Sequence, residues 1–482
     1  MLYAMPVYSL PTTICCIGRP CSRSGAIDMN TVNKKLTRLF ISTLFLVISA
    51  PVGAGGHDQR AVEKAKIKLT LIRNVRVWEG NDDELTAAQN VLVENNLIKT
   101  LNADDSVDGA DVIDGGGRIM IPGIIEAHGH LALSTPPAEL GDTDLGYMGA
   151  VSVKAAEIYL MRGWTTVRDI GGPSQGLAKA IDDGVVPGPR IYPSAMIISQ
   201  TSGHGDMRRL NDPHPNMGGS ATIMDRFKLL ADGPAEVRRA VRESLRMGAT
   251  QIKVMAGGGI SSKYDPIDTV QYSVEEMRAA VEAAADWDTY VAVHAYTNEA
   301  VNRALDAGVK VIEHGHLLSR ETLKRVKKEG AYLSSQSFGF IRRFIQPGQT
   351  GGAGGKAAQV MEGVDRLMET ARDIDLPVAF GTDTFGSLRA YRAGQTEFGF
   401  RKRWFDSPEI LIQATRHNAE LLELTGLRNP YPDGALGVIA EGAYADLLLV
   451  EGNPLENVAL LEDYENNIKL IMKDGKVYKN TL

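Results

Sequence analysis

The sequence predicts an α/β protein in which a (β/α)8 TIM-type barrel carries a small composite β-sandwich domain built from both chain ends. Two observations support this fold class. Residues 123–433 alternate short apolar strand candidates with amphipathic helices. The segments on either side hold short strand candidates separated by Asn-, Asp- and Gly-rich turns. About eight strand–helix units in the middle segment match such a barrel.

The composition is that of an ordinary globular protein. The chain has 482 residues, 44% of them hydrophobic and 23% charged, which excludes intrinsic disorder and collagen-like or coiled-coil architecture. Its formal net charge of -7 argues against a nucleic-acid partner, because such binding usually requires a basic face. All three cysteines lie within the first 21 residues, so the rest of the chain has no disulfide framework.

Residues 1–54 have the parts of a secretory leader. A basic cluster within 34–38 precedes an apolar stretch over 39–50, and small residues follow up to Ala54. Such a stretch spans roughly 18 Å as a helix, which is short of the ~30 Å hydrocarbon core. We therefore expect cleavage near Ala54, with Met29 as an alternative start, and an exported protein, periplasmic or secreted, without stable membrane association. Retention as a single-pass anchor is the alternative.

The two flanks are expected to form one small β-domain, because neither has many strands. The first flank covers residues 55–122 and the second 434–482. Their strand candidates are 67–72, 75–78, 90–93, 97–101, 118–121, 445–450 and 469–477.

The middle segment, 123–433, is expected to form the barrel. An open, doubly wound sheet is the alternative, but no glycine-rich dinucleotide fingerprint follows its first strand. The glycine-rich segment 348–355 predicts a rim loop. Helices are expected at 235–247, 274–285, 299–307 and 320–329. Strand candidates end near His128, Asp169, Ser199, Met255, His294, His314, Ser335 and Asp383.

His128 and His130 close the first predicted barrel strand. Residues i and i+2 of an extended segment point the same way, so both imidazoles can bind one cation. Either histidine alone is more typical of a core or surface position. The pair, at the end of a barrel strand where catalytic residues lie, favours a metal site.

Lys253 lies in the apolar strand candidate 249–256. A bare ammonium there would carry a large desolvation penalty. One interpretation is a lysine that is salt-bridged or reaches the rim. The other is a lysine with a depressed pKa that reacts with carbon dioxide, giving a carbamate that bridges two cations.

His294, His314 and Asp383 each end a predicted strand of the same barrel. Because the carboxyl ends of barrel strands meet at one face, these side chains are expected to converge with the first histidine pair. Nitrogen and oxygen ligands without thiolates suit zinc, and also manganese, cobalt or nickel.

The sequence resembles the amidohydrolase superfamily over residues 67–477. The resemblance rests on the segment 122–130, which ends in His128-Gly129-His130, and on Lys253, His294, His314 and the segment 381–383. The tail 441–449 is similar to the returning β-strands of the family. Glu126 departs from the pattern, since aspartate is usual two residues before the first histidine.

The resemblance implies a centre of two divalent metal ions, with zinc as the expected metal. His128 and His130 would bind the more buried ion together with Asp383, and His294 and His314 would bind the other. Carbamylated Lys253 and a hydroxide would bridge them. The hydroxide would attack the scissile carbonyl, while Asp383 acts as general base and then as general acid.

The resemblance is strongest to the dipeptidase and carboxypeptidase branch, which releases a C-terminal amino acid and includes ochratoxin-cleaving amidohydrolases. The segments 200–206 and 255–259 carry it. Three side chains are candidates for substrate contacts: His204 beside the scissile bond or holding a loop, Tyr264 at the substrate α-carboxylate, and His316 lining the pocket. Further candidates for binding the substrate carboxylate are Arg208, Arg209 and Lys263. Three other histidines lack a ligand-like sequence context: His57, His214 and His417.

The expected function is hydrolysis of the amide bond of dipeptides or N-acyl amino acids, which includes ochratoxin-type aryl-acyl phenylalanine. A cyclic-amide or lactone hydrolase on the same metals is one alternative. A non-catalytic, exported metal- or solute-binding protein is another, although it would leave Asp383 and Lys253 without a purpose. The expected partner is a small amide or peptide, and a homo-oligomer is in keeping with many relatives. The residues leave the side-chain preference, the native metal and the oligomeric state open.

Overall fold

The computed structural model describes residues 67–81, 84–136, 139–215, 223–337 and 352–482. These ranges belong to one compact unit that begins at Lys66. The predicted leader, 1–54, lies outside the described residues, so its removal and the export of the protein stay predictions.

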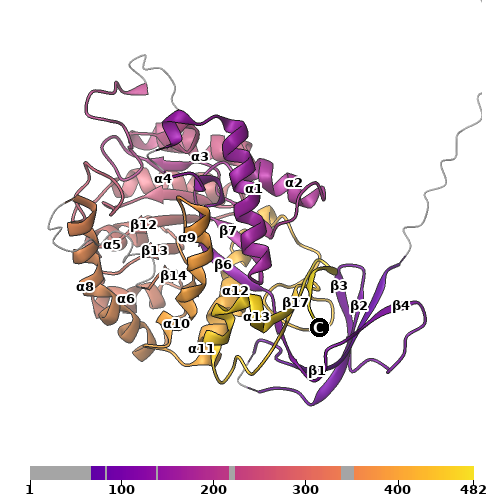
Figure 1. Ribbon diagram of the computed structural model, residues 1–482. Coiled ribbons are helices and arrows are strands. Elements are labelled where there is room, and N and C mark those ends of the chain that lie inside the picture. The colour runs from indigo at the N-terminus through magenta and orange to yellow at the C-terminus, as the bar shows by residue number, and fades with distance from the viewer. Residues whose placement is uncertain (1–66, 82–83, 137–138, 216–222, 338–351) are drawn as a thin grey trace, which may run out of the picture. The chain divides into compact units, whose positions relative to one another are not determined.

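The strands and helices of the described ranges alternate along the middle of the chain, while strands dominate both ends (Figure 1). The strands are β1 (Leu69–Val77), β2 (Ala88–Glu94), β3 (Leu97–Leu101), β4 (Ala110–Asp114), β5 (Ile119–Pro122), β6 (Ile124–Gly129), β7 (Trp164–Asp169), β8 (Arg190–Pro193), β9 (Ile197–Ser199), β10 (Lys228–Leu230), β11 (Ile252–Met255), β12 (Val291–Ala295), β13 (Val311–His314), β14 (Tyr332–Ser335), β15 (Val378–Phe380), β16 (Leu447–Val450), β17 (Ile468–Lys473) and β18 (Lys476–Asn480). The helices are α1 (Leu145–Met161), α2 (Gln175–Asp182), α3 (Gly233–Arg246), α4 (Val274–Ala285), α5 (Asn298–Asp306), α6 (Arg320–Lys328), α8 (Gly352–Asp373), α9 (Leu388–Ala393), α10 (Glu397–Arg401), α11 (Ser407–Ile412), α12 (Asn418–Glu423) and α13 (Tyr464–Asn467).

Strands from both chain ends share one eight-stranded sheet, of order β18-β17-β16-β5-β1-β2-β3, with β4 paired to β1. The junction is β5, which runs parallel to β1 and antiparallel to β16. Apolar side chains from both ends, among them Val77, Val91, Leu447 and Leu470, form one buried cluster. Their burial gives the two ends a common core, which neither could form alone.

Two strand predictions at the ends differ from the structure. Residues 67–72 and 75–78 are one strand, β1, because a bulge after Ile72 lets the strand continue past Asn74, whose φ is 54°. Residues 469–477 are two strands, because Asp474 and Gly475 form a turn with positive φ at both positions. An Asp-Gly pair is a strong hairpin signal, so this turn could have been predicted from the sequence.

The middle strands form two parallel sheets. The seven-stranded sheet has the order β10-β9-β11-β12-β13-β14-β15, and the three-stranded sheet is β6-β7-β8. Single backbone contacts connect them at both margins. Thr250 N donates to Pro193 O at 2.7 Å between β8 and β11, and Gly129 forms a bridge with Thr384 beyond β15. The strands β6 to β8 and β11 to β15 follow one another in chain order and run parallel, as in a TIM-type barrel, while β10 pairs with β9 at the edge of its sheet. The hydrogen-bond ladder is interrupted at the two margins.

Helices cover the outer side of the central strands, as α4, α5, α6 and α8 do in Figure 1. The prediction for 274–285 matches α4, which begins at a capping box of Ser273 and Glu276. The helices predicted at 235–247, 299–307 and 320–329 are α3, α5 and α6, with bounds that differ by one or two residues.

The predicted rim loop at 348–355 is wrong for residues 352–355, which begin helix α8. Residues 348–351 lie outside the described ranges. Glycine is a weak helix former, but α8 buries Val360, Val364 and Leu367 against the barrel. This apolar face outweighs the propensity of its glycine-rich start.

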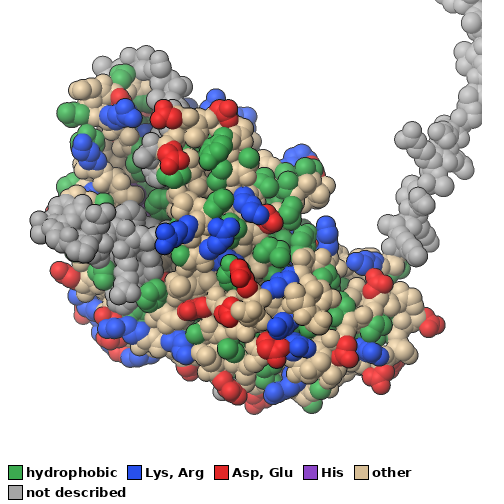
Figure 2. Space-filling view, in the orientation of Figure 1, with side chains coloured by type: hydrophobic (Ala, Val, Ile, Leu, Met, Phe, Trp, Pro, Cys, Tyr) green, Lys and Arg blue, Asp and Glu red, His purple; other side chains and the backbone are tan. Residues whose placement is uncertain are grey.

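The visible surface of the described part carries acidic and basic side chains interspersed with one another (Figure 2). Within the described ranges, no helix has both the length and the apolar character needed to cross a bilayer.

Arg190 at the start of β8 ties the middle segment to the terminal sheet. Its Nε donates to Asp446 Oδ2 at 3.1 Å and its Nη2 to Asp474 Oδ1 at 2.6 Å. The guanidinium also stacks 3.8 Å from the centre of the Tyr444 ring. Arg190 and Asp446 are both buried, so removing either one would leave the charge of the other without its partner.

Arg190→Met is expected to lower the free energy of unfolding by about 3–5 kcal/mol, because it leaves the Asp446 carboxylate buried without its partner. Arg118→Met is the matched control. It removes an ion pair with Glu451 that is partly exposed, and it is expected to cost less than about 1 kcal/mol. Urea unfolding followed by circular dichroism measures both. Equal losses in the two variants would show that the Arg190 pair has no special structural role.

Candidate metal centre

The predicted ligands lie at or near the carboxyl ends of five strands. His128 is in β6 and His130 directly follows it, Lys253 is in β11, His294 is in β12, His314 ends β13, and Asp383 follows β15 by three residues. All six side chains are buried. The parallel strand order therefore brings residues that are up to 255 positions apart in the sequence into one site.

The tightest group is formed by His128, His130, His314 and Asp383. Asp383 Oδ1 lies 3.6 Å from His128 Nε2 and 3.2 Å from His130 Nε2. Ligand atoms of His128, His314 and Asp383 all lie within 4.8 Å of one another. This spacing fits a single cation held between the three side chains, with only small adjustments.

The imidazole rings form a continuous arc across the site. Ring centres are 4.2 Å apart for His204 and His294, 4.5 Å for His294 and His314, 4.8 Å for His314 and His128, and 5.2 Å for His128 and His130. The arc therefore brings five imidazoles, with their ring nitrogens, into one buried place.

Burial keeps three of these histidines neutral, because it lowers the pKa of His128, His294 and His314 well below the ordinary value. Burial also acts on His130, but the hydrogen bond and the charge of Asp383 outweigh it and raise the pKa of that ring. A neutral imidazole has a lone pair that can bind a metal ion.

Each histidine is held through the ring nitrogen that faces away from the centre. His128 Nδ1 donates to Glu313 Oε2 at 2.7 Å, His130 Nδ1 to Gly171 O at 3.0 Å, and His314 Nδ1 to Gln336 Oε1 at 2.7 Å. These bonds leave Nε2 of His128 and His314 as the lone-pair nitrogen, whereas Nε2 of His130 faces Asp383 Oδ1 at 3.2 Å. His294 is reversed, because its Nε2 donates to Gly258 O at 3.1 Å and its Nδ1 therefore carries the lone pair.

Behind His128 lies a buried ion pair. Glu313 Oε1 accepts from Arg168 Nη2 at 2.6 Å, while its other oxygen holds His128. Arg168 also donates to Ala127 O at 2.6 Å and to the Tyr290 hydroxyl at 3.3 Å. The guanidinium fixes the carboxylate, and the carboxylate fixes the tautomer and orientation of the ligand ring.

Two of the predicted ligands have strained backbone. The φ of His314 is 72° and that of Asp383 is 48°, values that side chains with a Cβ rarely adopt. Strain of this kind persists where the surroundings fix it, and it is common at functional sites.

Lys253 is buried in the barrel strand, and burial lowers its pKa to about 8. None of the described residues forms a hydrogen bond or ion pair with its Nζ. The sequence also allowed a lysine that forms a salt bridge or that reaches the exposed rim. Lys253 is buried and forms no salt bridge with the described residues, so neither of these two interpretations has support there.

Glu126, which stands where aspartate is usual, has a structural role. It accepts hydrogen bonds from the backbone N of His128 at 2.9 Å, from the backbone N of Thr382 at 2.8 Å and from Thr382 Oγ1 at 2.6 Å. It thus connects β6 to the segment that carries Asp383. The backbone N of Asp383 also donates to His128 O at 2.9 Å.

His204 stacks on His294 at the outer end of the imidazole arc. Its Nδ1 contacts Ser262 Oγ at 2.6 Å and Asp265 Oδ2 at 3.2 Å. Gly259 makes room for this ring, because a Cβ there would overlap it. His204 therefore adjoins the predicted ligands and is firmly oriented.

His316 and Tyr264 occupy different surroundings. His316 is buried beside His314, and its Nε2 donates to Gln336 O at 2.8 Å. Its Nδ1 has no hydrogen-bond partner among the described residues, and burial lowers its pKa to about 4. Tyr264 is 39% exposed and lines a separate pocket with Lys263, Arg208 and Arg209.

The histidines without a ligand-like context lie away from the predicted ligands or outside the described ranges. His417 is in a π-helical turn, and burial lowers its pKa to about 4. His214 contacts Thr201 Oγ1 at 3.2 Å. His57 lies outside the described residues.

Sequence reasoning missed Tyr296, whose ring lies 5.0 Å from His294, 5.3 Å from His314 and 5.7 Å from His316. Burial, together with the charge of Asp383, raises its pKa well above the ordinary value, so the phenol stays protonated. Its signal was available, because it follows His294 by two residues and so points the same way. Arg168 was also missed, although a charged residue in an apolar strand was the signal that singled out Lys253.

Comparisons with known proteins agree with this geometry. Residues 119–478 match the Amidohydrolase family. The ochratoxinase of Aspergillus niger is 30% identical to this chain over 388 residues, covering 75% of this chain and 76% of that protein.

Two solved structures are similar over most of the chain. A prolidase complexed with N-methylphosphonate-L-proline has a TM-score of 0.77 and 31% identity, covering 86% of this chain and 100% of that chain. A Xaa-Pro dipeptidase with methionine bound in its active site has a TM-score of 0.74 and 28% identity, with the same coverage. The fold is therefore of the TIM-barrel type, and the protein is a hydrolytic enzyme that acts on amide C–N bonds. With three-quarters of its length matched by the family, the chain belongs to the amidohydrolases.

Proposed function

We propose that this enzyme is a metal-dependent hydrolase that cleaves the amide bond of dipeptides or N-acyl amino acids and releases the C-terminal amino acid. The observation that carries the proposal is the buried arc of imidazoles that ends at Asp383 and has Lys253 beside it. The three relatives support the substrate class, since their names describe an ochratoxinase, a prolidase and a Xaa-Pro dipeptidase. Ochratoxin-type aryl-acyl phenylalanine is therefore within the proposed range.

The proposed ligand set is for two divalent cations. Its nitrogen and oxygen donors suit zinc, the expected metal, as well as manganese, cobalt or nickel. His128, His130 and Asp383 would hold one cation, and His294 with His314 the other. When bound, the cations would lower the pKa of a coordinated water and polarise the scissile carbonyl. The lone-pair nitrogens set by Glu313, Gln336 and Gly258 support His128, His314 and His294 as ligands.

Lys253 is proposed to react with carbon dioxide and become the ligand shared by both cations. Its neutral Nζ would attack the carbon of CO2 and lose one proton to water, which gives a carbamate with two donor oxygens. Its burial and the lack of a partner among the described residues support this step, because an ammonium there would be poorly stabilised.

Asp383 is proposed to accept the proton that the attacking water loses and to pass it to the nitrogen of the leaving amine. Its position beside His128 and His130 supports this role. His204 is oriented by Ser262 and Asp265, and it is proposed to contact the substrate near the scissile bond. His316 is proposed to line the substrate pocket beside His314.

The finer features of the fold are proposed in the same way. We infer that the two parallel sheets act as one closed (β/α)8 barrel, which the contacts at Thr250 and Gly129 support. The terminal strands are proposed to form a small β-sandwich from residues 55–122 and 434–482, with the barrel between them at 123–433.

A hydrolysis panel after metal quantification tests the function. We expect about two metal ions per chain and hydrolysis of dipeptides and N-acyl amino acids, but little hydrolysis of the matching C-terminal amides. Asp383→Asn is expected to lower kcat by about 10³-fold and serves as the control for a contaminating hydrolase. Matched cyclic amides and lactones are included, and faster hydrolysis of these would favour the alternative function.

Lys253→Ala is expected to bind about one metal ion fewer and to lose about 10³-fold or more in kcat/KM, because the shared ligand is absent. Lys473→Ala is the matched control, since Lys473 is a buried lysine of the terminal sheet. Metal analysis and steady-state kinetics measure both variants. A fully active Lys253→Ala enzyme would disprove the bridging role.

Glu313→Gln is expected to weaken metal affinity by about 10–100-fold, because His128 loses the carboxylate that orients it. Glu397→Gln is the control, since Glu397 is also buried in an ion pair, with Arg401. Metal affinity is measured by competition with a chelator, and folding by thermal unfolding. The role of Glu313 is refuted should both variants weaken metal binding equally.

A further inference from the structure

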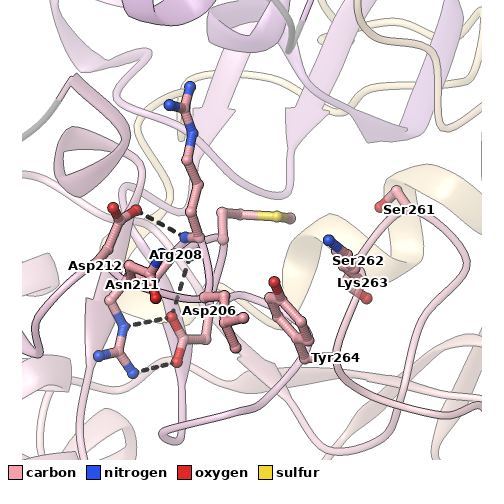
Figure 3. Close-up of a pocket in the computed structure, with 11 residues that line it drawn as sticks. Asp206, Arg208, Asn211, Asp212, Ser261, Ser262, Lys263 and Tyr264 are labelled. Atoms are coloured by element: carbon pink, nitrogen blue, oxygen red, sulfur yellow. Dashed lines mark hydrogen bonds and ion pairs between the residues drawn. The ribbon is translucent and has the colours of Figure 1, made fainter. Parts of the chain in front are cut away.

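A cavity of about 530 Å³ lies between two loops that follow barrel strands. One wall is the segment 206–212, beyond β9, and the other is 261–264, beyond β11. Figure 3 shows the two loops facing each other, with the ring of Tyr264 between them and the pair of Asp206 and Arg208 on the opposite wall. The volume falls within the ~300–1,000 Å³ range of small-molecule sites.

The cavity is one side chain away from the predicted ligands. Ser262, which lines it, contacts His204 at 2.6 Å, and the ring of His204 stacks on His294 at 4.2 Å. The second loop is also fixed in place, because Lys356 donates to the carbonyl oxygens of Gly259 and Ser262 at 2.9 Å each. The cavity therefore adjoins the predicted ligands through Ser262 and His204.

The acidic side chains of this cavity are already engaged. Asp206 accepts two hydrogen bonds from Arg208, at 2.8 and 2.6 Å, and it lies 3.9 Å from Lys228. Asp212 accepts from the backbone N of Arg209 at 2.7 Å. These carboxylates are therefore poor candidates for holding a cationic ligand.

Two cations of the cavity remain uncommitted. Within the described part of the chain, the guanidinium of Arg209 and the ammonium of Lys263 have no ion-pair partner, and Lys263 only lies 5.2 Å from the centre of the Tyr264 ring. Both side chains are exposed at the cavity. The cavity thus offers charge to an anion.

Apolar surface lies beside these cations. Met207 is 40% exposed, Tyr264 39% and Leu210 80%, and all three line the cavity. Exposed apolar side chains grouped around a cavity are typical of a ligand site. The preferred ligand therefore combines an anionic group with a large apolar group.

We propose that this cavity is the subsite for the released amino acid. Arg209 and Lys263 bind its α-carboxylate, and its apolar or aromatic side chain lies against Met207, Leu210 and Tyr264. The inference rests on the proposed function, and it narrows the substrate class to chains that end in a large apolar residue with a free carboxylate.

The first experiment measures binding without hydrolysis. Calorimetry compares L-phenylalanine with L-phenylalaninamide on the metal-loaded enzyme, on Arg209→Ala/Lys263→Ala and on the control Arg239→Ala. Arg239 is an exposed arginine of α3 outside the cavity. The wild type and the control are expected to bind the acid at least about tenfold more tightly than the amide, and the double variant is expected to lose this preference.

The second experiment uses kinetics on N-acyl phenylalanine and N-acyl alanine. The double variant is expected to raise KM by about 10²-fold with kcat changed less than about threefold, because the cations bind ground and transition state alike. Tyr264→Ala is expected to reduce the preference for phenylalanine over alanine. A third substrate carries its only carboxylate on the acyl half, with an amidated C-terminus.

The outcomes separate the two proposals. If the double variant keeps its preference for the acid while the wild type hydrolyses the panel, the subsite is wrong and the proposed function stands. If the wild type hydrolyses nothing but the double variant loses carboxylate-dependent binding, the subsite stands and the proposed function fails. A loss confined to the substrate with the acyl carboxylate overturns the assignment to the released amino acid.

Discussion

The ion pair between Arg168 and Glu313 is the interaction on which the candidate metal centre depends. Both side chains are fully buried, so neither charge would be tolerated without the other. The pair spans the barrel from β7 to β13, and the second carboxylate oxygen holds His128. One buried charge pair therefore fixes the relative position of two strands and the orientation of a ligand. A neutral substitute would fill the space but would not hold the imidazole as strongly.

Glu126 is a second buried carboxylate that connects two strands. It lies where the hydrogen-bond ladder between β15 and β6 is interrupted. Its carboxylate accepts four hydrogen bonds, two from Thr382, one from the backbone N of His128 and one from the Tyr159 hydroxyl. They replace regular strand pairing and hold Asp383 in its left-handed conformation beside His128. Glutamate is one methylene longer than the aspartate usual at this place, and that methylene lets one side chain reach both the β6 backbone and Thr382.

Much of this site could be predicted from the sequence, because its signals are local. The spacing of His128 and His130, and the positions of His294 and His314 at strand ends, place them on one face without knowledge of the contacts between strands. The partners Glu313 and Gln336 could not be assigned in the same way. Which ligand each one holds depends on strand register, and the sequence alone does not specify that register. The prediction for the start of α8 was wrong for a related reason. Its glycines indicate a loop locally, while the apolar face of the helix packs on the barrel.

The terminal sheet is also part of the site's construction. Strand β5 of that sheet is separated by Gly123 alone from β6, which carries His128. A Cβ at Gly123 would overlap Thr165 of β7, so the chain passes there directly from one sheet to the other. The backbone N of Gly123 donates to Asp446 O at 2.9 Å, and the side chain of Asp446 binds Arg190 of β8. The first three barrel strands are therefore connected to the pairing of the two chain ends. Loosening that pairing would displace β6, and with it both histidines that stand next to Asp383.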